Sequence, residues 1–506
     1  MKVYSIPSYI EMLNEEGLLV ESKVVDPTIA IEHITYNSKD TKPYTLFACK
    51  GASFKKDYLD EAVDHDIACY LSETKYDTNK PVSYLIVSNI RKAMALVADA
   101  FYDQAYSKLN LIGITGTKGK STTSYYIKYI FDEYLQSVGK KPSGIVSSID
   151  VYDGIIKKEA HLTTPEAFEL HEHFDNAVKS GIEYFEMEVS SQALKYDRVL
   201  GVTFDVSVFL NISEDHISPI EHSDYNDYLN AKLKIFNQCK LAVVNLNTDD
   251  KERVLKAAKQ SPLQTTFGYV ENADYYGYNI KKENDAITFM CKGKNFNSQF
   301  KLTMPGLFNV ENALAAIAVC DYYHIPLEHI QNGLAKARSS GRMEIFSTPD
   351  QSVIAIVDYA HNKLSFEKLY QSTLEEYKGR KIITVFGCPG GKAYNRRVEL
   401  GDLSGKYSNK VYLTAEDPAY ESVNDISKEI EKYVTKHPCE CFLIDDRGEA
   451  IQAAILEAEP NSIILITGKG NETRQKIGST YVPCPTDSDY AKQFLAEVAA
   501  RAKINE

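Results

Sequence analysis

The sequence has no tryptophan, no paired cysteine motif and no long apolar run. Its nine cysteines are scattered without the CxxC spacing of zinc sites, so we expect reduced, mostly buried thiols. Cys388 lies in a glycine-rich loop that could expose it. No stretch approaches the ~20 apolar residues that span a bilayer, and the first residues lack the apolar region of a signal peptide. We therefore expect a cytoplasmic protein without membrane insertion.

Positive charge is also in deficit relative to negative charge. The 57 Lys and Arg residues are outnumbered by 70 Asp and Glu, which gives a net charge of −13. This sign argues against nonspecific binding to nucleic acid and against adhesion to anionic membranes. The chain of 506 residues is too long for a single core and suggests about three domains.

The most informative motif is the glycine-rich segment Gly113-Ile-Thr-Gly-Thr-Lys-Gly-Lys-Ser-Thr122, which lies between an apolar, strand-like run and a helix-like segment. Backbone amides of such a loop, together with a helix N-terminus, attract phosphate oxygens. Lys120 would reach the β- and γ-phosphates, and the Ser121 hydroxyl would ligate Mg²⁺. Because Ile114 replaces the first glycine of the usual pattern, the loop matches the narrower T-G-T-x-G-K-[ST] form, typical of one group of ATP users. The alternative is a glycine-rich surface turn.

The order of the expected elements predicts an α/β protein with a small N-terminal α/β domain over 1–108, a central P-loop domain over 109–340 and a C-terminal Rossmann-like domain over 341–506. We expect the central sheet to be doubly wound and mostly parallel, with a β-hairpin excursion within 265–305. Strands are expected at 46–49, 68–71, 83–87, 109–114, 144–147, 184–189, 206–210, 241–245, 353–358, 381–386, 410–413, 441–444 and 462–467. Helices are expected at 124–131, 310–323 and 327–336.

Several polar motifs occupy strand ends, where open α/β sheets bind ligands. They are Glu186–Ser191, Asn211–His216, Asn245–Asp250, Gly341–Glu344, Asp358–His361, Gly387–Gly391 and Gly468–Glu472. Each alone is more often a helix cap than a catalytic group. The order in which these motifs follow the glycine-rich loop is more specific than any one of them and indicates a shared ligand site.

That ordered set resembles the Mur ligases, the ATP-dependent amino-acid ligases of peptidoglycan precursor synthesis, and is most similar to their tripeptide synthetases. The distinguishing marks are Asn37-Ser-Lys39, Leu46-Phe-Ala48, Thr163-Thr-Pro-Glu166, Met187-Glu-Val-Ser-Ser191, Arg198, Asp215-His216, Ala231-Lys232 and the C-terminal Gly-Lys-Gly-x-Glu. The resemblance implies that ATP phosphorylates a carboxylate of UDP-N-acetylmuramoyl-L-alanyl-D-glutamate, that an amino group attacks the acyl phosphate, and that phosphate leaves. We expect a monomer.

The resemblance also implies roles for individual residues. Ser38 would hold the uridine-diphosphate end of the substrate, and the muramoyl-peptide part would be bound by Thr163, Thr164, Ser190 and Arg198. ATP would be held by Gly116, Thr117, Lys118, Gly119, Lys120, Ser121 and Thr122, with Asn309 or Asn312 near adenine and Arg342 and Asp358 near ribose or phosphates. Two Mg²⁺ ions would be ligated by Ser121, Glu188, His216 and a CO₂-derived carbamate on Lys232 (N6-carboxylysine). The catalytic residues would be Lys120, Glu188, His216 and Lys232.

A physical argument supports the carbamate. A lysine ammonium with a pKa near ~10.4 has the wrong charge to lie beside Mg²⁺. Addition of CO₂ makes it an anion that can ligate a hard cation. Two metal ions and Lys120 would then neutralise charge during phosphoryl transfer. The alternatives are that Lys232 is a solvated helix lysine and that His216 is a structural histidine.

The incoming amino acid would be recognised by loops of the third region. The segment Thr414-Ala-Glu-Asp-Pro-Ala419 stands where members that use meso-diaminopimelate have Asp-Asn-Pro-Arg, so Ala419 replaces a carboxylate-binding arginine. Lys392 aligns with a second arginine of those members. Glu416 and Asp417, followed by Pro418, favour a side-chain ammonium, which predicts L-lysine. Gly468 and Glu472 resemble residues that bind the acceptor's α-groups.

Alternatives remain open. The acceptor could instead be L-ornithine or meso-diaminopimelate, and 416–417 could be a proline-containing turn with helix-capping acids. The chain could be another ligase of the superfamily, such as a folylpolyglutamate synthetase or an enzyme of a different peptidoglycan step. A different class is a nucleotide-switch protein, although the guanine-specifying Asn-Lys-x-Asp motif is absent.

Overall fold

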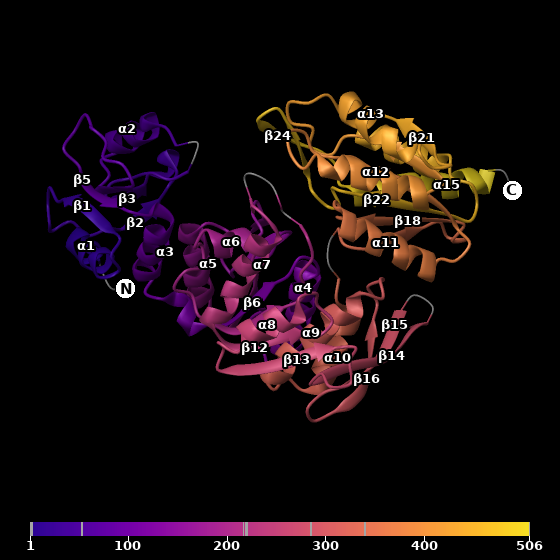
Figure 1. The fold of residues 1–506 in the computed structure, drawn as a ribbon, viewed down its shortest axis with the longest axis horizontal. Helices are drawn as coiled ribbons and strands as arrows, with labels where there is room; N and C mark the ends of the chain where they lie inside the picture. The colour runs from indigo at the N-terminus through magenta and orange to yellow at the C-terminus, as the bar shows by residue number, and fades with distance from the viewer. Residues whose placement is uncertain are drawn as a thin grey trace. The chain divides into compact units, whose positions relative to one another are not determined.

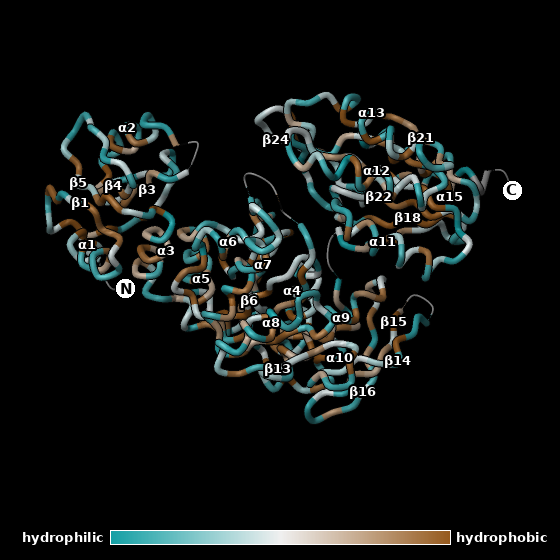
Figure 2. Tube along the Cα trace, viewed as in Figure 1, coloured by the Kyte–Doolittle hydropathy of each residue, from teal (hydrophilic) through white to brown (hydrophobic). Residues whose placement is uncertain are grey.

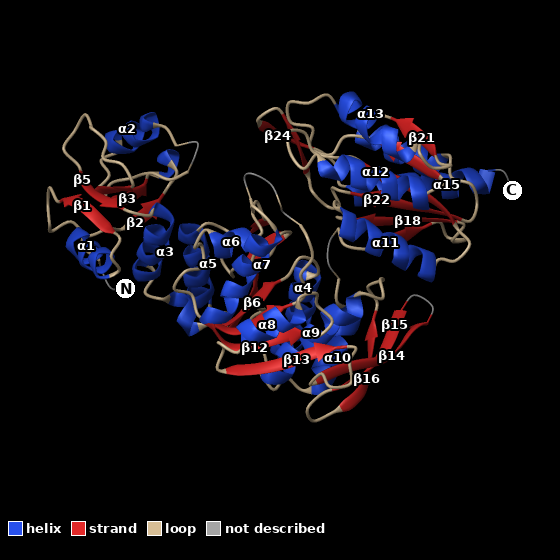
Figure 3. Ribbon diagram, viewed as in Figure 1, coloured by secondary structure: helices blue, strands red, loops and turns tan. Residues whose placement is uncertain are grey.

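The computed structural model describes residues 4–51, 54–215, 217, 221–283, 286–338 and 341–504. The chain divides into two compact units, one formed by Met1–Tyr276 with Ala315–Gly333 and the other by Gly277–Leu314 with Leu334–Glu506. Helices and strands alternate along most of the chain (Figures 1 and 3), which confirms the expected α/β class. The boundaries of the three expected domains stay a prediction.

The N-terminal region contains a five-stranded sheet. Its strand order is β1 (Leu19–Lys23), β5 (Ser83–Val87), β4 (Cys69–Ser72), β3 (Thr45–Ala48) and β2 (His33–Thr35). Strands β2 to β5 pair in parallel, and β1 pairs antiparallel with β5. The covering elements are α1 (Ile6–Glu15), η1 (Ser38–Asp40), α2 (Lys56–Asp64) and α3 (Ile90–Phe101). Leu46 and Phe47, adjacent on β3, enter two different hydrophobic clusters, because successive strand residues point to opposite faces.

The largest sheet has the order β16-β15-β14-β13-β12-β11-β6-β10-β7-β8-β9. Its strands are β6 (Asn110–Thr115), β7 (Gly144–Val146), β8 (Asp150–Tyr152), β9 (Lys157–Glu159), β10 (Tyr184–Glu188), β11 (Phe204–Phe209), β12 (Cys239–Asn245), β13 (Leu263–Gly268), β14 (Tyr275–Glu283), β15 (Ala286–Lys292) and β16 (Asn297–Leu302). Strand β6 pairs in parallel with β10 and β11, so the phosphate-loop strand is central and buried. The antiparallel pairing of β15 with β16 confirms the expected hairpin.

The helices of this region follow its strands. They are η2 (Ala105–Lys108), α4 (Lys120–Ser137), α5 (Ala167–Ser180), α6 (Ser191–Lys195), α7 (Tyr225–Leu233), η3 (Lys234–Gln238), α8 (Lys251–Ala258), α9 (Asn309–Tyr322) and α10 (Leu327–Lys336). A Cβ at Gly333 would lie 2.5 Å from the Ile130 Cα, so α10 can pack on α4 only with glycine there. Figure 2 shows hydrophobic residues concentrated along central strands such as β6 and hydrophilic residues along surface loops.

The C-terminal region has a six-stranded sheet in the order β17 (Glu344–Ser347), β18 (Val353–Asp358), β22 (Ser462–Thr467), β19 (Lys381–Phe386), β20 (Lys410–Leu413) and β21 (Glu440–Leu443). All neighbours are parallel except β17 and β18. Ile463 and Leu465 pack in one cluster with α11 (Lys363–Glu376), α12 (Asn395–Tyr407) and α13 (Val423–Val434). Ile464 and Ile466 pack in another with α14 (Arg447–Leu456) and α15 (Asp487–Ile504). Helices thus cover both faces, as expected of a doubly wound sheet.

One sequence expectation is settled by burial. Cys388 is 1% exposed and packs in the cluster with α11 to α13, so the expectation that its glycine-rich loop could expose it is wrong. Burial also raises the pKa of this thiol, which makes it a poor nucleophile. No helix among the described residues is long and apolar enough to cross a membrane.

Candidate active site

The glycine-rich loop connects β6 to α4 and depends on two glycines. Gly116 has φ +155°, and a Cβ there would lie 2.9 Å from the Leu210 Cβ. Gly119 has φ +87° and precedes α4, which begins without a side-chain cap. Larger residues would be strained at both positions. An uncapped helix N-terminus behind such a loop suits an anion such as phosphate.

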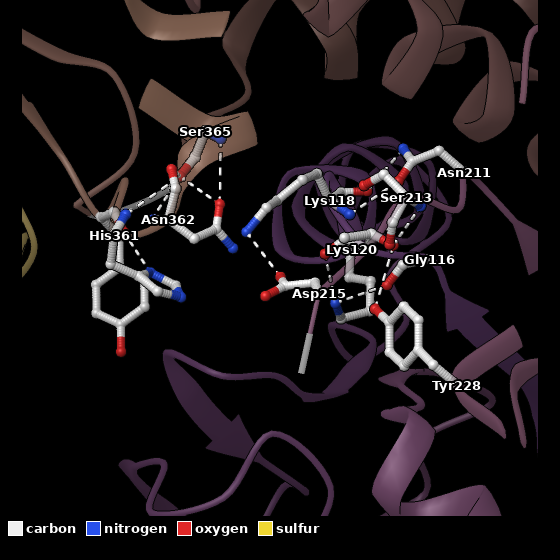
Figure 4. Close-up of polar contacts among 12 residues, drawn as sticks. Gly116, Lys118, Lys120, Asn211, Ser213, Asp215, Tyr228, His361, Asn362 and Ser365 are labelled. Atoms are coloured by element: carbon white, nitrogen blue, oxygen red, sulfur yellow. Dashed lines mark hydrogen bonds and ion pairs between the residues drawn. The ribbon is translucent and has the colours of Figure 1, made fainter. Parts of the chain in front are cut away.

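Asn211, just beyond β11, fixes the path of this loop. Its side chain accepts a hydrogen bond from the Lys118 amide (2.9 Å) and donates to the Lys118 carbonyl (3.0 Å), as Figure 4 shows. The Thr117 amide donates to the Asn211 carbonyl (3.0 Å), and Tyr228 donates to the Thr117 hydroxyl (3.1 Å). The sequence placed Asn211 in a strand-end motif but gave no sign of this role.

Two lysines converge on one carbonyl oxygen. Lys120 from α4 and Lys232 from α7 donate to the Gly116 carbonyl at 2.9 and 3.0 Å. Lys232 is 1% exposed, which excludes the solvated helix lysine. Burial lowers the pKa of Lys232 well below its ordinary value, and the cations of Lys120 and Lys118 lower it further, against the opposing effect of Asp215. Lys232 therefore gives up its proton more readily than an ordinary lysine.

Lys118 extends from the loop toward Asp215, with 3.5 Å between its Nζ and the Asp215 Oδ2. Figure 4 shows this pair beside the Lys120 side chain. Lys118 and Lys120 thus bring two cations to the loop beside Asp215, whereas Lys232 is disfavoured as an ammonium. Such an excess of positive charge favours a polyanionic ligand.

Ser148 joins two of the expected metal ligands. Its amide and hydroxyl donate to the Glu188 Oε1 at 2.8 and 3.2 Å, and its Oγ lies 3.0 Å from the Ser121 Oγ. A carboxylate and a hydroxyl on either side of Ser148 are oxygen donors of the kind Mg²⁺ prefers. His216 lies outside the described residues. Among those described, no group of three His, Cys, Asp or Glu residues could hold a metal ion.

The expected muramoyl-peptide residues meet at Thr164. Its hydroxyl donates to the Glu188 carbonyl (2.9 Å) and accepts from the Ser190 amide (3.0 Å). Arg198 donates to the Thr164 carbonyl (3.0 Å) and pairs with Glu166 at 2.8 Å. Three of the predicted residues are thus brought together beside the candidate metal ligand Glu188.

For the other two expected substrate residues, Thr163 and Ser38, the structure gives burial and local position only. Thr163 precedes Thr164 and is half-buried. Ser38 begins η1, where the Asn37 side chain accepts a hydrogen bond from the Lys39 amide. Ser38 itself is buried. Its role toward a uridine diphosphate stays a prediction.

The expected adenine and ribose residues belong to the second unit. Asn309 and Asn312 lie in the first turn of α9, where Asn312 donates to the Asn309 side chain at 2.9 Å. Asp358 ends β18 and accepts from the Met343 amide (2.9 Å), and the Arg342 guanidinium lies 4.6 Å from the centre of the Tyr359 ring. Figure 4 also draws the capping box of Asn362 and Ser365 that begins α11.

The expected acceptor residues lie on the loops after β20 and β22. Lys469 connects these loops, because its Nζ donates to the Asp417 Oδ1 at 3.0 Å and to the Glu472 Oε2. Sequence reasoning missed Lys469, although it lies inside the Gly-Lys-Gly-x-Glu motif. Helix α13 is capped by Ser422, so neither Glu416 nor Asp417 is a helix-capping acid.

Glycine brings Glu416 close to the second loop. Gly468 has φ +104°, and a Cβ there would lie 3.3 Å from the Glu416 Oε2. Burial raises the pKa of Glu416 to about 7; Arg396 and Arg447 lower it, Asp417 raises it and Lys469 lowers it. This acid therefore titrates near neutral pH.

Ala419 and Lys392, which stand where diaminopimelate-adding members are expected to have arginines, lie in different surroundings. Ala419 has φ +51°, and its amide and carbonyl bond Lys476 (3.1 Å) and Gly478 (2.7 Å) of the β23–β24 hairpin (Arg474–Ile477 and Thr480–Pro483). Lys392 is exposed. Pro418 is buried, and its carbonyl would lie 1.9 Å from a Cβ at Gly390, so the two loops are in close contact.

Comparison with known proteins agrees with this geometry. Residues 114–320 match the Mur ligase middle domain, and residues 341–470 match the Mur ligase glutamate ligase domain. A UDP-N-acetylmuramyl-tripeptide synthetase of Lactobacillus acidophilus is 33% identical and aligns over 98% of each chain. A UDP-N-acetylmuramoyl-L-alanyl-D-glutamate–L-lysine ligase of Streptococcus pyogenes is 37% identical over 92% of this chain and 93% of its own.

Solved structures share the fold. A UDP-N-acetylmuramoyl-L-alanyl-D-glutamate–2,6-diaminopimelate ligase aligns with a TM-score of 0.64 and 22% identity over 98% of this chain and 99% of its own. A MurF ligase from Thermotoga maritima, solved in complex with ADP, aligns with a TM-score of 0.61 and 16% identity over 93% of this chain and 99% of its own. With the full-length relatives above, these findings show that the chain belongs to the Mur ligase family.

Proposed function

We propose that this protein is an ATP-dependent ligase that joins L-lysine to UDP-N-acetylmuramoyl-L-alanyl-D-glutamate during cytoplasmic synthesis of peptidoglycan precursors, acting as a monomer. The observation that carries the choice of amino acid is the loop after β20, which presents Glu416 and Asp417 and has Ala419 where an arginine would bind a second carboxylate. The relative from Streptococcus pyogenes named as a lysine ligase supports the same choice.

The phosphate loop would activate the substrate. The γ-phosphoryl group of ATP passes to a substrate carboxylate, which gives an acyl phosphate and ADP. Lys120 would stabilise the negative charge that develops on the transferring group, as in other phosphoryl-transfer sites. Asn211 keeps the loop amides in place for the phosphates.

Two Mg²⁺ ions would be held by Ser121, Glu188, His216 and a carbamate on Lys232, together with phosphate oxygens and water. Their positive charge, when bound, would neutralise the phosphate oxygens. The environment of Lys232 supports the modification, because only an unprotonated amine adds CO₂ and burial favours that form. The cations of Lys118 and Lys120, which disfavour an ammonium at this point, would stabilise the carbamate anion.

The acceptor would bind through the third-region loops. Its uncharged α-amine attacks the acyl phosphate, the new amide bond forms and inorganic phosphate leaves. Thr164, Ser190 and Arg198 would hold the muramoyl peptide, and Ser38 the uridine diphosphate. Asn309 or Asn312, with Arg342 and Asp358, would contact the nucleoside.

An acceptor panel tests the proposal. Purified protein with Mg²⁺, ATP and UDP-N-acetylmuramoyl-L-alanyl-D-glutamate is given L-lysine, L-ornithine or meso-diaminopimelate, and ADP and product mass are measured. We expect the lysine product to form fastest. Preference for diaminopimelate would overturn the amino-acid assignment, and turnover only with a folate substrate and glutamate would favour a folylpolyglutamate synthetase. Phosphate release independent of any acceptor would favour a nucleotide switch.

A further inference from the structure

The acceptor loops contain an ammonium group of their own. Lys469 is 3% exposed, and its Nζ donates to Asp417 and Glu472. Burial alone would lower the pKa of Lys469, but the two carboxylates outweigh it and raise the pKa above the ordinary value. Lys469 is therefore charged at neutral pH.

Both partner acids are engaged further within the chain. Asp417 Oδ1 also accepts from the Lys476 amide at 2.9 Å. Glu472 Oε1 accepts from the Tyr359 hydroxyl at 3.0 Å. Each carboxylate is thus fixed in orientation by groups of the protein itself, and the two share the positive charge of Lys469.

Glu416 is different. None of the residues that the structure describes donates a hydrogen bond to its carboxylate, although its backbone carbonyl accepts from Gln475 at 2.9 Å. The charged and titratable groups that interact electrostatically with the Glu416 carboxylate are Arg396, Arg447, Asp417, Lys469, Cys388 and Tyr359. Of the three acids on these loops, Glu416 is the one that a ligand cation can still pair with.

We propose that Lys469 is a positioning residue of the acceptor site: it orients Asp417 and Glu472 and offsets part of their charge, so that Glu416 is left to receive the incoming side-chain ammonium group. This inference rests on the proposed function. Without Lys469, the three neighbouring carboxylates would repel one another, lose their fixed orientation and hold protons more tightly, so the incoming ammonium group would meet no single ordered anion. With Lys469 in place, the site is matched to an amino acid whose side chain carries one ammonium.

The backbone of the two loops is held independently of Lys469. Arg447 donates to the carbonyl of Ala415 (3.1 Å), which directly precedes Glu416, and to the carbonyl of Thr467 (2.8 Å), which directly precedes Gly468. Arg447 also forms a bidentate ion pair with Asp487, in which Nε and Nη2 donate to Oδ1 and Oδ2 at 2.7 and 2.6 Å. Replacing Lys469 should therefore change the charge of the site without changing the path of the loops.

The test uses the full-length enzyme and measures initial rates against each substrate. In Lys469→Met, which keeps most of the stem but removes the charge, we expect the KM for L-lysine to rise at least tenfold while the KM for ATP stays within twofold. Lys432→Met, an exposed lysine on α13, is the matched control and should leave both unchanged. In Lys469→Ala, propylamine should restore lysine addition, whereas 1-propanol, of similar size but uncharged, should not.

Two outcomes would overturn the inference. One is a KM for lysine within twofold of wild type in Lys469→Met. The other is equal rescue by 1-propanol, which would show that Lys469 only fills space. If melting curves show that both variants are unfolded, Glu416→Gln and Asp417→Asn decide: the inference requires the larger rise in KM for lysine in Glu416→Gln, and the reverse order refutes it. A wild-type enzyme that does not use lysine would instead refute the proposed function.

Discussion

The phosphate loop and the acceptor loops are opposite in their electrostatics. Around Gly116 the chain gathers Lys118, Lys120 and Lys232 with Asp215 as the opposing carboxylate. On the loops after β20 and β22 it gathers three acids and pairs two of them with Lys469. The first region keeps an excess of positive charge for a polyanion, and the second reduces its own excess of negative charge. In their proposed roles, the difference teaches that a loop that binds ATP needs strong positive charge, whereas loops that select an amino acid need only a limited negative charge.

The largest effect should come from removing the charge of the phosphate loop. Lys120→Ala should lower kcat by about 10³- to 10⁵-fold, or roughly 4–7 kcal/mol, because the lysine stabilises charge that develops during transfer. Initial-rate measurement of ADP release checks this. Lys259→Ala, at an exposed position after α8, should have wild-type activity. A loss below tenfold in Lys120→Ala would contradict the assignment.

The second largest effect should be on folding stability, and it should come from the buried ion pair that supports the acceptor loops. Arg447→Met leaves Asp487 buried without its partner and should cost about 3–5 kcal/mol in the free energy of unfolding. Urea denaturation measures the change. The double variant Arg447→Met/Asp487→Leu should recover part of this loss, since no unpaired charge remains. No recovery would show that the pair acts mainly through its bonds to Ala415 and Thr467.

The next prediction tests whether Lys232 carries a carbamate, which would place an anion among the lysines of the phosphate loop. Lys232→Arg should lower kcat by about 10²-fold, because a guanidinium does not form a stable carbamate and leaves positive charge beside the metal ion. Removal of dissolved CO₂ and bicarbonate should lower the activity of the wild type but not that of the variant. Full activity in Lys232→Arg would rule out the carbamate.

The smallest effect concerns pH. Glu416 has a pKa of about 7, above its ordinary value because of burial, so it is protonated as the pH falls below 7. An ammonium ligand pairs with the ionised form, and the KM for lysine should therefore rise about tenfold per pH unit below 7. Glu416→Gln should remove this dependence, and Glu449→Gln, at an exposed position of α14, should retain it. An unchanged profile in Glu416→Gln would assign the titration to another group.

The fold was largely predictable from strand patterns. Val353–Asp358, Lys381–Phe386 and Ser462–Thr467 form strands at the bounds expected from their apolar runs. The edge strand Glu344–Ser347 was missed, because its residues alternate between exposed and half-buried positions and lack a continuous apolar run. Short strands such as Lys157–Glu159 give still less signal.

The candidate site was predictable in its residue types but not in its pairings. The motif around Lys120 indicated a phosphate loop, because the spacing of glycines and lysine follows from local backbone needs. The roles of Asn211, Ser148 and Lys469 depend on contacts between segments far apart in sequence, and a single sequence does not reveal them. The burial of Lys232 was likewise hidden, since its helix also carries exposed polar residues.

The guanidinium of Arg447 has a consequence for the evolution and inhibition of this enzyme. Because it bonds the carbonyls of both Ala415 and Thr467, we expect a substitution that displaces one acceptor loop to shift the other as well. A lineage that changed its cell-wall amino acid would therefore need coordinated substitutions in both segments. A small molecule that competed with Asp487 for this one side chain would disorganise both segments together.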